Sequence, residues 1–413
     1  MPEKAEIKNK WEAVELGSLC REIVGGGTPS TKIQNYWNGQ NPWITSKWLG
    51  KNLYLKNGEK MISDEAIKNS ATHIVPENSL IFATRVGVGK VGINKIPMAI
   101  NQDLAGLVIS NEADPLFVAY QLKTDRVQQY VVSLKRGATI QGITREDLKQ
   151  IIIHKPALNE QKAIAGMLMT IQKAITGQEE LIDKLKELKR SMMQFLFAHG
   201  TKGEKTKITE IGEIPESWEV VEIGMVCAEA NKKERNKKIC QEDRTKLLTV
   251  KLYAKGIIWR NLAITKKFKP SKLYQVKNHD FIYSKIDARN GAWGFIKEEF
   301  DGGLVSGDFP ILELNFAKIS KEYLEIVMSR DKMWLPIKNI SSGTTGRRRV
   351  NPQEFLKVIM IALPSLNEQN QIVKTIESIG QKTESAQGKL SIYQNLFKTL
   401  LHELMNGERR IKF

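Results

Sequence analysis

Two glycine-rich, basic loops are the segments of this chain best suited to bind a polyanion. Residues 341–349 read SSGTTGRRR, and residues 135–142 read KRGATIQG. Glycine lets backbone N–H groups approach a phosphate closely, and arginine can bridge a phosphate or grip the O6 and N7 atoms of guanine. A basic loop is often only solvated surface, but its occurrence in both parts of the chain favours contact with DNA.

Motifs of the common catalytic classes are missing or incomplete. Residues 87–92 match GxGxxG, but Pro97 and a strand-like pattern follow where a dinucleotide-binding loop needs a helix. No GxxxxGK[ST] loop or HExxH motif occurs, and the five histidines are scattered. Residues 41–42 and 351–352 are Asn-Pro, but they lack the second proline and the aromatic residue of the amino-methyltransferase motif Asn-Pro-Pro-Tyr. We therefore expect a non-catalytic protein and not a self-sufficient nuclease or methyltransferase.

Composition bounds the class of protein. The 413 residues exceed what one hydrophobic core usually holds, so two or more domains are expected. Lys and Arg total 63 against 46 Asp and Glu, and a net charge of +17 favours a nucleic-acid partner over a merely basic surface. The three cysteines (Cys20, Cys227 and Cys240) suit a reducing cytosol and form no metal-binding cluster. The charged N-terminus and the lack of a membrane-length apolar run predict a cytoplasmic protein.

The chain contains an internal repeat. Residues 11–17 (WEAVELG) recur as residues 218–224 (WEVVEIG), and residues 156–161 (PALNEQ) recur as residues 364–369 (PSLNEQ). The two offsets, 207 and 208 residues, nearly agree. Chance would hardly produce both matches at one spacing, so we expect two domains of one fold.

A long helix is predicted after each Leu-Asn-Glu-Gln segment. Asn159 and Asn367 can serve as N-caps with an acidic residue in the first turn, and Gly200 and Gly407 fall where each helix would end. Apolar residues then recur at alternating spacings of four and three, the heptad pattern of a coiled coil. Each helix of roughly 40 residues would be about 60 Å long. The alternative is a pair of amphipathic helices buried in separate domains.

The same ten seam positions occur in both helices, shifted by 208 residues. They are Ile164, Leu168, Ile171, Ile175, Gln178, Ile182, Leu185, Lys189, Met192 and Leu196 in the first helix, and Ile372, Ile376, Ile379, Thr383, Ala386, Leu390, Tyr393, Phe397, Leu400 and Leu404 in the second. The middle of the seam is weak, because polar or small residues interrupt it and four glycines (Gly166, Gly177, Gly380 and Gly388) each cost about 1 kcal/mol relative to alanine.

These elements predict four segments and a mixed α/β (α+β) fold with sheet and helices in each domain. Residues 1–157 form a first globular domain, 158–200 a long helix, 201–365 a linker with the second domain, and 366–407 a second long helix. Residues 198–217 are predicted to be the linker, because glycines and Pro215 stand there among charges. If the helices pair antiparallel, the domains lie at opposite ends of a rod and are related by a pseudo-two-fold axis.

The two domains share an apolar framework but differ in polar residues beside it. Residues 80–82 (LIF) align with 281–283 (FIY), and residues 92–93 (GI) with 294–295 (GF). Beside them, Thr84-Arg85 aligns with Lys285 and its neighbours, and residues 101–102 (NQ) align with residues 306–307 (SG). Different polar sets on one scaffold would suit the reading of two base sequences, although drift after duplication is the alternative. Basic runs at 232–238 and 266–269 could add contacts to the DNA backbone or be solvated charge.

Over essentially its full length the chain resembles the specificity subunit of type I restriction–modification enzymes. The resemblance is carried by residues 25–30 (GGGTPS) with 36–39 (YWNG), residues 212–215 (GEIP) with Trp218, residues 343–349 (GTTGRRR), and the paired LNEQ helix starts. It implies two target-recognition domains that each read one half of a bipartite DNA site. It also implies two long antiparallel coiled-coil helices that set the spacing and bind two methyltransferase subunits.

The resemblance further implies that chemistry belongs to partner subunits. S-adenosylmethionine, ATP and Mg²⁺ would bind there and not to this chain, and restriction subunits would be a further partner where the system has them. Five apolar residues outside the seam (Leu181, Leu188, Phe195, Leu396 and Leu401) could dock methyltransferase helices, or be only a wide edge of the seam.

By position, we expect DNA contacts from polar residues at equivalent places in the two domains. They are Thr28, Ser30, Thr84, Arg85, Asn101, Gln102, Arg136, Thr139 and Gln141 in the first domain, and Lys285, Arg289, Asn290, Ser306, Thr344, Thr345, Arg347, Arg348 and Arg349 in the second. A scaffold protein that bridges DNA without sequence preference is the alternative function, and it predicts steep salt dependence for any duplex.

Overall fold

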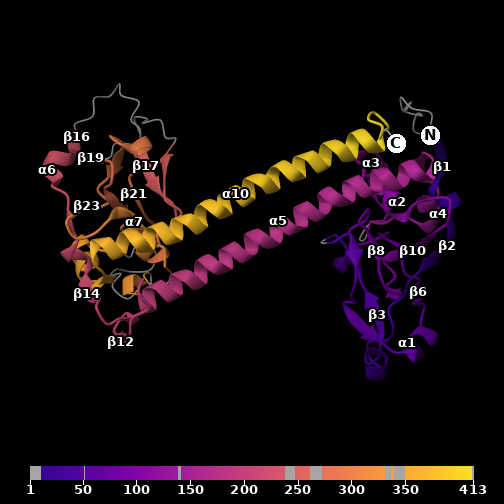
Figure 1. Ribbon diagram of the computed structural model, residues 1–413, viewed down its shortest axis with the longest axis horizontal. Helices are drawn as coiled ribbons and strands as arrows, with labels where there is room; N and C mark the ends of the chain where they lie inside the picture. The colour runs from indigo at the N-terminus through magenta and orange to yellow at the C-terminus, as the bar shows by residue number, and fades with distance from the viewer. Residues whose placement is uncertain are drawn as a thin grey trace. The chain divides into compact units, whose positions relative to one another are not determined.

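The computed structural model describes residues 11–50, 52–137, 141–237, 247–260, 272–330, 333, 336–338 and 349–411. The chain divides into two compact units, Met1–Leu181 with Ala386–Phe413, and Ile182–Ser385. The division cuts across both long helices, α5 (Leu158–His199) and α10 (Leu366–Met405). Each unit is therefore a globular domain together with one part of each long helix (Figure 1).

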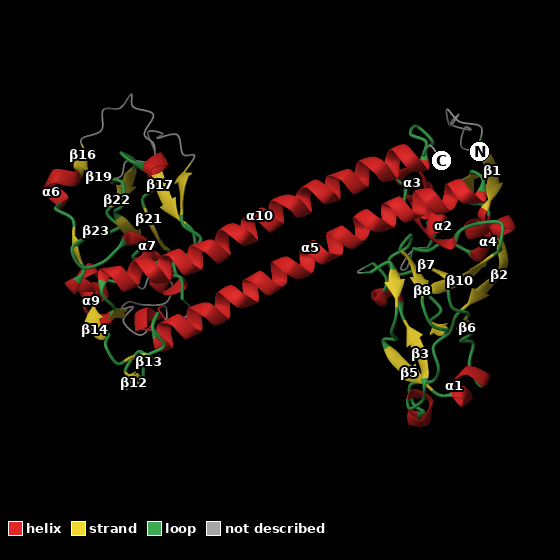
Figure 2. Cartoon of the chain, viewed as in Figure 1, coloured by secondary structure: helices red, strands yellow, loops and turns green. Residues whose placement is uncertain are grey.

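The first domain is built on two small sheets (Figure 2). One has the order β2 (Cys20–Gly25), β10 (Leu104–Ile109), β7 (Leu80–Ala83), β8 (Val91–Asn94) and β4 (Tyr54–Leu55). The other has the order β5 (Lys60–Ile62), β3 (Asn41–Ile44), β9 (Met98–Ile100) and β6 (Ile74–Val75). Short helices surround them: α1 (Asp64–Lys68), α2 (Pro115–Leu122), α3 (Asp125–Ser133) and α4 (Arg145–Lys149). A separate ladder pairs β1 (Glu12–Glu15) with β11 (Ile152–Lys155), antiparallel.

The second domain repeats this plan. One sheet has the order β15 (Cys227–Glu229), β23 (Ile311–Leu314), β20 (Phe281–Tyr283) and β21 (Trp293–Phe295). The other has the order β16 (Asn236–Lys237), β19 (Leu273–Gln275), β22 (Leu304–Ser306), β17 (Leu247–Val250) and β18 (Ile257–Arg260). Its helices include α6 (Lys232–Arg235), α7 (Lys321–Met328) and α9 (Pro352–Val358). Strands β14 (Glu219–Glu222) and β24 (Met360–Leu363) pair antiparallel, as β1 and β11 do.

The equivalent strands β7 and β20 explain the shared apolar framework. In β7, Leu80 and Phe82 enter one core cluster while Ile81 enters another. In β20, Phe281 and Tyr283 likewise enter one cluster while Ile282 enters the other. Side chains alternate between the faces of a strand, and both faces are covered here, so each strand needs an unbroken apolar run. The predicted mixed fold with an internal repeat is confirmed.

Helices α5 and α10 pair antiparallel within each unit. In the first, Ile164 and Leu168 near the start of α5 share a core with Leu400 and Leu404 near the end of α10. In the second, Leu196 near the end of α5 shares a core with residues of the first turns of α10. The ten predicted seam positions of each helix are buried or half-buried. Chain order and resemblance alone suggested this orientation, and packing at both ends now supports it.

The repeated glutamines Gln161 and Gln369 anchor the start of each long helix. Gln161 is buried; its Nε2 donates to the carbonyl of Pro156 at 2.9 Å, and its Oε1 accepts from the N–H of Asp114 at 2.9 Å. Gln369 does the same with Pro364 at 3.0 Å and Ser320 at 2.8 Å. In each domain the glutamine therefore ties the long helix to the residue that caps α2 or α7.

The neighbouring glutamates Glu160 and Glu368 bind the chain that follows the other long helix. Glu160 accepts two hydrogen bonds from Arg410, at 3.2 and 2.9 Å. Glu368 accepts from the N–H of Thr201 at 2.9 Å and from the indole of Trp218 at 3.1 Å. In each unit, these contacts join the start of one long helix to the chain that leaves the end of the other.

Two sequence-based expectations were wrong. The helices begin at Leu158 and Leu366, so Asn159 and Asn367 lie inside the first turn and are not N-caps. The expected linker at 198–217 contains an antiparallel hairpin of β12 (Thr206–Thr209) and β13 (Gly212–Pro215). Ile214 and Trp218 at its end are buried in the core of the second domain, so this stretch is part of that domain. The predicted C-terminal glycines do end the helices, with Gly200 at φ 66° and Gly407 at φ 68°.

Candidate nucleic-acid interface

Three loops of the first domain meet beside the end of β7. The N–H of Thr84 donates to the carbonyl of Asp103 at 2.8 Å, and the N–H of Ile143 donates to the carbonyl of Thr84 at 2.8 Å. The β7–β8 loop, the turn before β10 and the glycine-rich loop before α4 are thereby held together. Residues that lie far apart in the sequence thus come to line one surface.

This surface is an open hollow of about 640 Å³. Four predicted residues line it, namely Thr84, Arg85, Gln102 and Arg136. Arg145 lines it too, and sequence reasoning missed this residue. The signal that could have found it is its place directly after the glycine-rich loop, at the start of a short helix. Three guanidinium groups at one hollow favour an anionic or acceptor-rich partner.

The arginines of this hollow differ in their protein contacts. Arg136 donates to Asp147 at 3.1 Å. Burial works against a charge on Asp147, but hydrogen bonds from Thr144 and the charge of Arg136 outweigh it and lower the pKa of this carboxyl group. Within the described part of the chain, Arg85 and Arg145 have no side-chain hydrogen bond or ion pair. Their donors therefore remain available to a partner.

Two further predicted residues of the first domain, Thr28 and Asn101, lie next to residues of this hollow. Thr28 donates through Oγ1 to Oε1 of Gln102 at 2.5 Å, and both residues are exposed. Asn101 is buried and binds both the side chain and the N–H of Asp103, so it holds the turn that presents Gln102. Ser30 and Gln141 are exposed.

The second domain has an equivalent but differently charged site. Lys285 occupies the place of Thr84: its N–H donates to the carbonyl of Asp308 at 2.9 Å, and its carbonyl accepts from Val350 at 2.9 Å. Its ammonium group donates to the carbonyl of Gly307 at 2.8 Å, and Arg349 pairs with Asp308 at 3.2 Å. Burial and the nearby charge of Lys232 lower the pKa of Lys285. The predicted residue Ser306 is next to Gly307 and half-buried.

Arg289 and Asn290 lie at the other end of the β20–β21 loop, in the short helix η5 (Ala288–Asn290). The carbonyl of Asn290 accepts from the N–H of Tyr253 at 2.8 Å, which joins η5 to the turn after β17. Five predicted DNA contacts (Thr139, Thr344, Thr345, Arg347 and Arg348) lie outside the described residues, as does the basic run 266–269.

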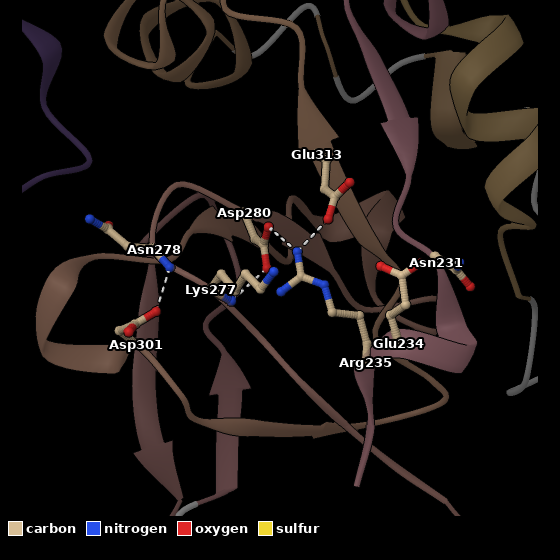
Figure 3. A network of polar contacts seen from close by, with 8 residues as sticks. All are labelled: Asn231, Glu234, Arg235, Lys277, Asn278, Asp280, Asp301 and Glu313. Atoms are coloured by element: carbon tan, nitrogen blue, oxygen red, sulfur yellow. Dashed lines mark hydrogen bonds and ion pairs between the residues drawn. The ribbon is translucent and has the colours of Figure 1, made fainter.

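One cation of the basic run 232–238 is structural. Arg235 is buried and bonds to Asp280 at 3.1 Å and to Glu313 (Figure 3). Asp280 in turn accepts from the N–H of Lys277 at 2.6 Å. A guanidinium group committed to two carboxylates inside the domain is not available to a DNA backbone, so the expectation for this residue was wrong. Lys233 and Lys237 of the same run are exposed.

Groups of three or more His, Cys, Asp or Glu side chains that could hold a metal ion do not occur in the described ranges. In the same part of the chain, every helix is too short or too polar to span a membrane. The segment 87–92, which matched GxGxxG, covers the end of the turn between β7 and β8 and the first two residues of β8, with Gly87 and Gly89 at positive φ.

The chain contains two copies of one α/β domain, and each copy carries a basic site. This arrangement defines a class of protein that can bind its ligand at two places through the same fold. The family model described as "Type I restriction modification DNA specificity domain" matches residues 8–187 and again residues 215–392. The chain belongs to this family. Both matches start near the repeated tryptophans and run into the long helices.

Individual relatives carry the same description. The MjaIX specificity subunit of a type I restriction enzyme of Methanocaldococcus jannaschii is 24% identical, with 98% of this chain and 95% of the relative covered. The MjaVIII specificity subunit of the same organism is also 24% identical, with 98% and 94% covered. The crystal structure of the type I restriction–modification S subunit from M. genitalium has a similar fold, with a TM-score of 0.58, 16% identity and 97% of each chain covered.

Proposed function

We propose that this chain is the non-catalytic specificity subunit of a type I restriction–modification enzyme and that each domain reads one half of a bipartite DNA site. The observation that carries the proposal is the difference between two equivalent sites. Thr84 and Arg85 stand in the first domain where Lys285 and Ile286 stand in the second, on the same backbone hydrogen bonds. One scaffold with two polar sets suits two different base sequences.

The long helices would set the distance between the half-sites and bind partner subunits. Large apolar side chains outside the seam are exposed on them, namely Leu181, Leu188, Phe195 and Leu396, with Leu401 half-exposed. Exposed apolar side chains grouped on a helix commonly mark a protein interface. We infer that two methyltransferase subunits dock there.

Methylation and cleavage would then belong to those partners. S-adenosylmethionine, ATP and Mg²⁺ would bind to the methyltransferase and restriction subunits and not to this chain. A complex that acts on chromosomal DNA would reside in the cytoplasm.

The spacing of the half-sites provides the test. The chain is combined with its methyltransferase partner, and affinity is measured for duplexes whose two half-sites are separated by spacers of different length. Inserting two base pairs should abolish specific binding, because it turns one half-site by about 70° around the helix axis. Equal affinity for every spacer would contradict the proposal.

The alternative, a scaffold protein without sequence preference, is separated by competition. At fixed salt, a random duplex should compete poorly against the cognate duplex if the chain reads sequence. Equal competition would favour the scaffold.

A further inference from the structure

Each domain presents an exposed aromatic side chain in the connection that follows one of two equivalent strands. Strands β3 and β17 are equivalent, because each runs parallel to the neighbouring strand β9 or β22. In the connection that follows, Trp48 is 40% exposed in the first domain and Tyr253 is 57% exposed in the second. The two connections differ in length, but each carries a large aromatic ring with exposed carbon surface, which makes both rings candidates for contact with a partner.

The turn around Trp48 holds the ring in place. Trp48 ends the short helix η3 (Ser46–Trp48), and its N–H donates to the carbonyl of Thr45 at 3.0 Å. Its indole N–H donates to the carbonyl of Asn57 at 3.0 Å. The polar atom of the ring is therefore satisfied within the protein, and what the ring offers to a partner is its carbon surface.

The turn around Tyr253 is held by a different device. Tyr253 and Ala254 have φ values of 62° and 52°, a left-handed backbone region that is strained for residues with a side chain. Their N–H groups donate to the carbonyls of Asn290 and Gly291, both at 2.8 Å. These bonds fix the strained turn onto η5, so Tyr253 is presented on a rigid support.

Equivalent glycines allow these turns to approach the main sheet. A Cβ on Gly92 of β8 would lie 3.1 Å from Cδ2 of Leu49, the residue after Trp48. A Cβ on Gly294 of β21 would lie 3.3 Å from Cα of Gly256 in the second turn. The pair Gly92 and Gly294, matched in the sequence repeat, thus keeps the same close approach in both domains.

The turns also lie beside the loops that carry the cationic sites. In the first domain the β7–β8 loop begins with Thr84 and Arg85 at the hollow and ends with Lys90, whose side-chain carbons come within 3.4 Å of the Cβ position of Gly50. In the second domain the β20–β21 loop begins near Lys285 and reaches Tyr253 through Asn290. Each aromatic turn is therefore connected to the cationic site of its domain through one short loop.

Exposed lysines lie in or beside both turns. Lys47 and Lys90 lie at the first turn, and Lys251 and Lys255 at the second. The ammonium group of Lys255 is 5.9 Å from the centre of the Tyr253 ring. A carbon surface bordered by lysines matches the chemistry of duplex DNA, in which apolar groups lie between rows of phosphates.

We propose that Trp48 and Tyr253 are DNA-contacting residues, one in each domain, whose exposed ring carbons pack on an apolar group of the duplex while the adjacent lysines bind phosphates. The apolar group is the 5-methyl group of a thymine or the carbons of a deoxyribose. This inference rests on the proposed function and adds to it a pair of contacts outside the cationic sites.

The test measures the affinity of the chain, in complex with its methyltransferase partner, for the cognate duplex. Trp48→Ala and Tyr253→Ala should each weaken binding roughly ten-fold, as expected for losing the burial of about half an aromatic side chain. The slope of affinity against salt should stay unchanged, because neither variant removes a cation. Val132→Ala and Met225→Ala are matched controls, because both residues are 57% exposed and lie outside the two turns.

Trp48→Phe and Tyr253→Phe separate contact from support. Phenylalanine keeps a ring but loses the hydrogen bond to Asn57 in the first case and the hydroxyl group in the second, so it should retain most of the affinity. If phenylalanine weakens binding as much as alanine does, the residues act only by supporting their turns, and the proposal is overturned. Thermal unfolding identifies any alanine variant that fails to fold. At that position, the affinity of the phenylalanine variant for the cognate duplex tests the proposal.

Uracil-for-thymine substitution in the duplex then identifies the apolar group. Weaker binding of the wild type at one position, without further loss in the alanine variant, assigns the contact to a thymine methyl group. Lack of any such position assigns it to deoxyribose. If the wild type prefers the cognate duplex but both alanine variants bind like the controls, only this inference fails. If the wild type shows no preference, the proposed function itself fails.

Discussion

Arg136 and Arg145 line the same hollow but are held differently by the protein. Arg136 forms an ion pair with the buried carboxylate of Asp147. Burial opposes the charge on Asp147, but the hydrogen bonds from Thr144 and the charge of Arg136 lower its pKa. The position of Arg136 is therefore set before any ligand binds. Arg145 projects from the first position of α4 towards Gly25, where a Cβ would lie 3.2 Å from its Nη1 atom. The glycine leaves the room that this guanidinium group occupies. We therefore assign Arg136 to shaping the glycine-rich loop and Arg145 to contact with DNA.

The first prediction separates these roles. Arg145→Gln should lower affinity for the cognate duplex by about 1–3 kcal/mol and leave thermal unfolding unchanged, because no described residue depends on its charge. Arg136→Gln should lower both, since it removes the partner of Asp147. Lys149→Gln is the control, because it lies on the same helix and, among the described residues, forms an ion pair only with the exposed Glu146. Affinity of Arg145→Gln equal to that of the control would refute the assignment.

His154 makes the stability of the first domain depend on pH. It lies in β11, its Nδ1 atom is buried without a hydrogen-bond partner among the described residues, and burial together with the charge of Arg126 lowers its pKa to about 4. Between the ordinary pKa of 6.5 and this value, the unfolded chain binds a proton that the folded chain does not. The contribution of neutral His154 to stability is therefore fully present above about pH 6.5 and is lost as the pH falls towards 4.

The second prediction uses the repeat as its guide. The position of His154 in β11 corresponds to Ala362 in β24, so alanine is already accommodated in the equivalent ladder. His154→Ala should make the decline of the melting temperature between pH 6.5 and 4 shallower than in the wild type. Calorimetry at a series of pH values checks this. An unchanged slope would show that another group controls the acid response.

The long helices contain glycines that the packing does not require. Gly166, Gly177 and Gly388 have no atom within 4 Å of a Cβ position, apart from the backbone of their own helix, and all three are exposed. Gly200 is different, because it ends α5 with φ 66° and a Cβ there would lie 2.7 Å from Oε1 of Glu368. One residue type thus serves as a helix terminator at one position and only weakens the helix at three others.

The third prediction follows from this contrast. Gly177→Ala should raise the free energy of unfolding by about 1 kcal/mol, and the same change at Gly166 or Gly388 should do likewise. Gly200→Ala should lower it by about 1 kcal/mol or more, because alanine is strained at this φ and collides with Glu368. Denaturant unfolding followed by circular dichroism measures both. If Gly177→Ala stabilises the helix but reduces DNA binding, the glycine is kept for function and not for folding.

Elements with long periodic patterns were predictable from the sequence, and elements fixed by single contacts were not. The heptad seam indicated α5 and α10 over their full length, because many residues carry that signal. Asn159 and Asn367 were mistaken for N-caps, because the sequence does not show that Gln161 and Gln369 anchor the helix start through buried hydrogen bonds to distant residues. The hairpin of β12 and β13 was mistaken for a linker, since glycine and proline also mark the turns of short strands.

The residues of the candidate sites could likewise be predicted only in part. The glycine-rich loop indicated the hollow and Arg136, but Arg145 follows the loop within a helix and joins the hollow only through tertiary structure. Arg235 belonged to a basic run in the sequence, yet burial beside Asp280 and Glu313 makes it a core residue. Composition predicts a cationic surface, whereas only tertiary contacts decide which cations are free.

At the scale of the whole molecule, the first compact unit is assembled from both ends of the chain. Leu400, Leu404 and Met405 of α10 enter the same core as Phe117 of α2. The carbonyl of Met405 accepts from the buried side chain of Gln121 at 2.9 Å, and Arg410 binds Glu160. The second unit ends at Ser385 and does not include this segment. The C-terminus therefore completes the domain that the N-terminus begins.

The fourth prediction tests this interleaving by deletion of residues 386–413. Loss of the three apolar side chains and of the partner of Gln121 removes part of the first core, so the first domain should unfold although its own sequence is intact. The second core should persist, because its residues lie between 182 and 385. Amide hydrogen exchange reports on each: protection should be lost in β7 and kept in β20. Equal protection in β7 and β20 would mean that the first domain folds without the end of α10. Neither domain would then need residues 386–413 in order to fold.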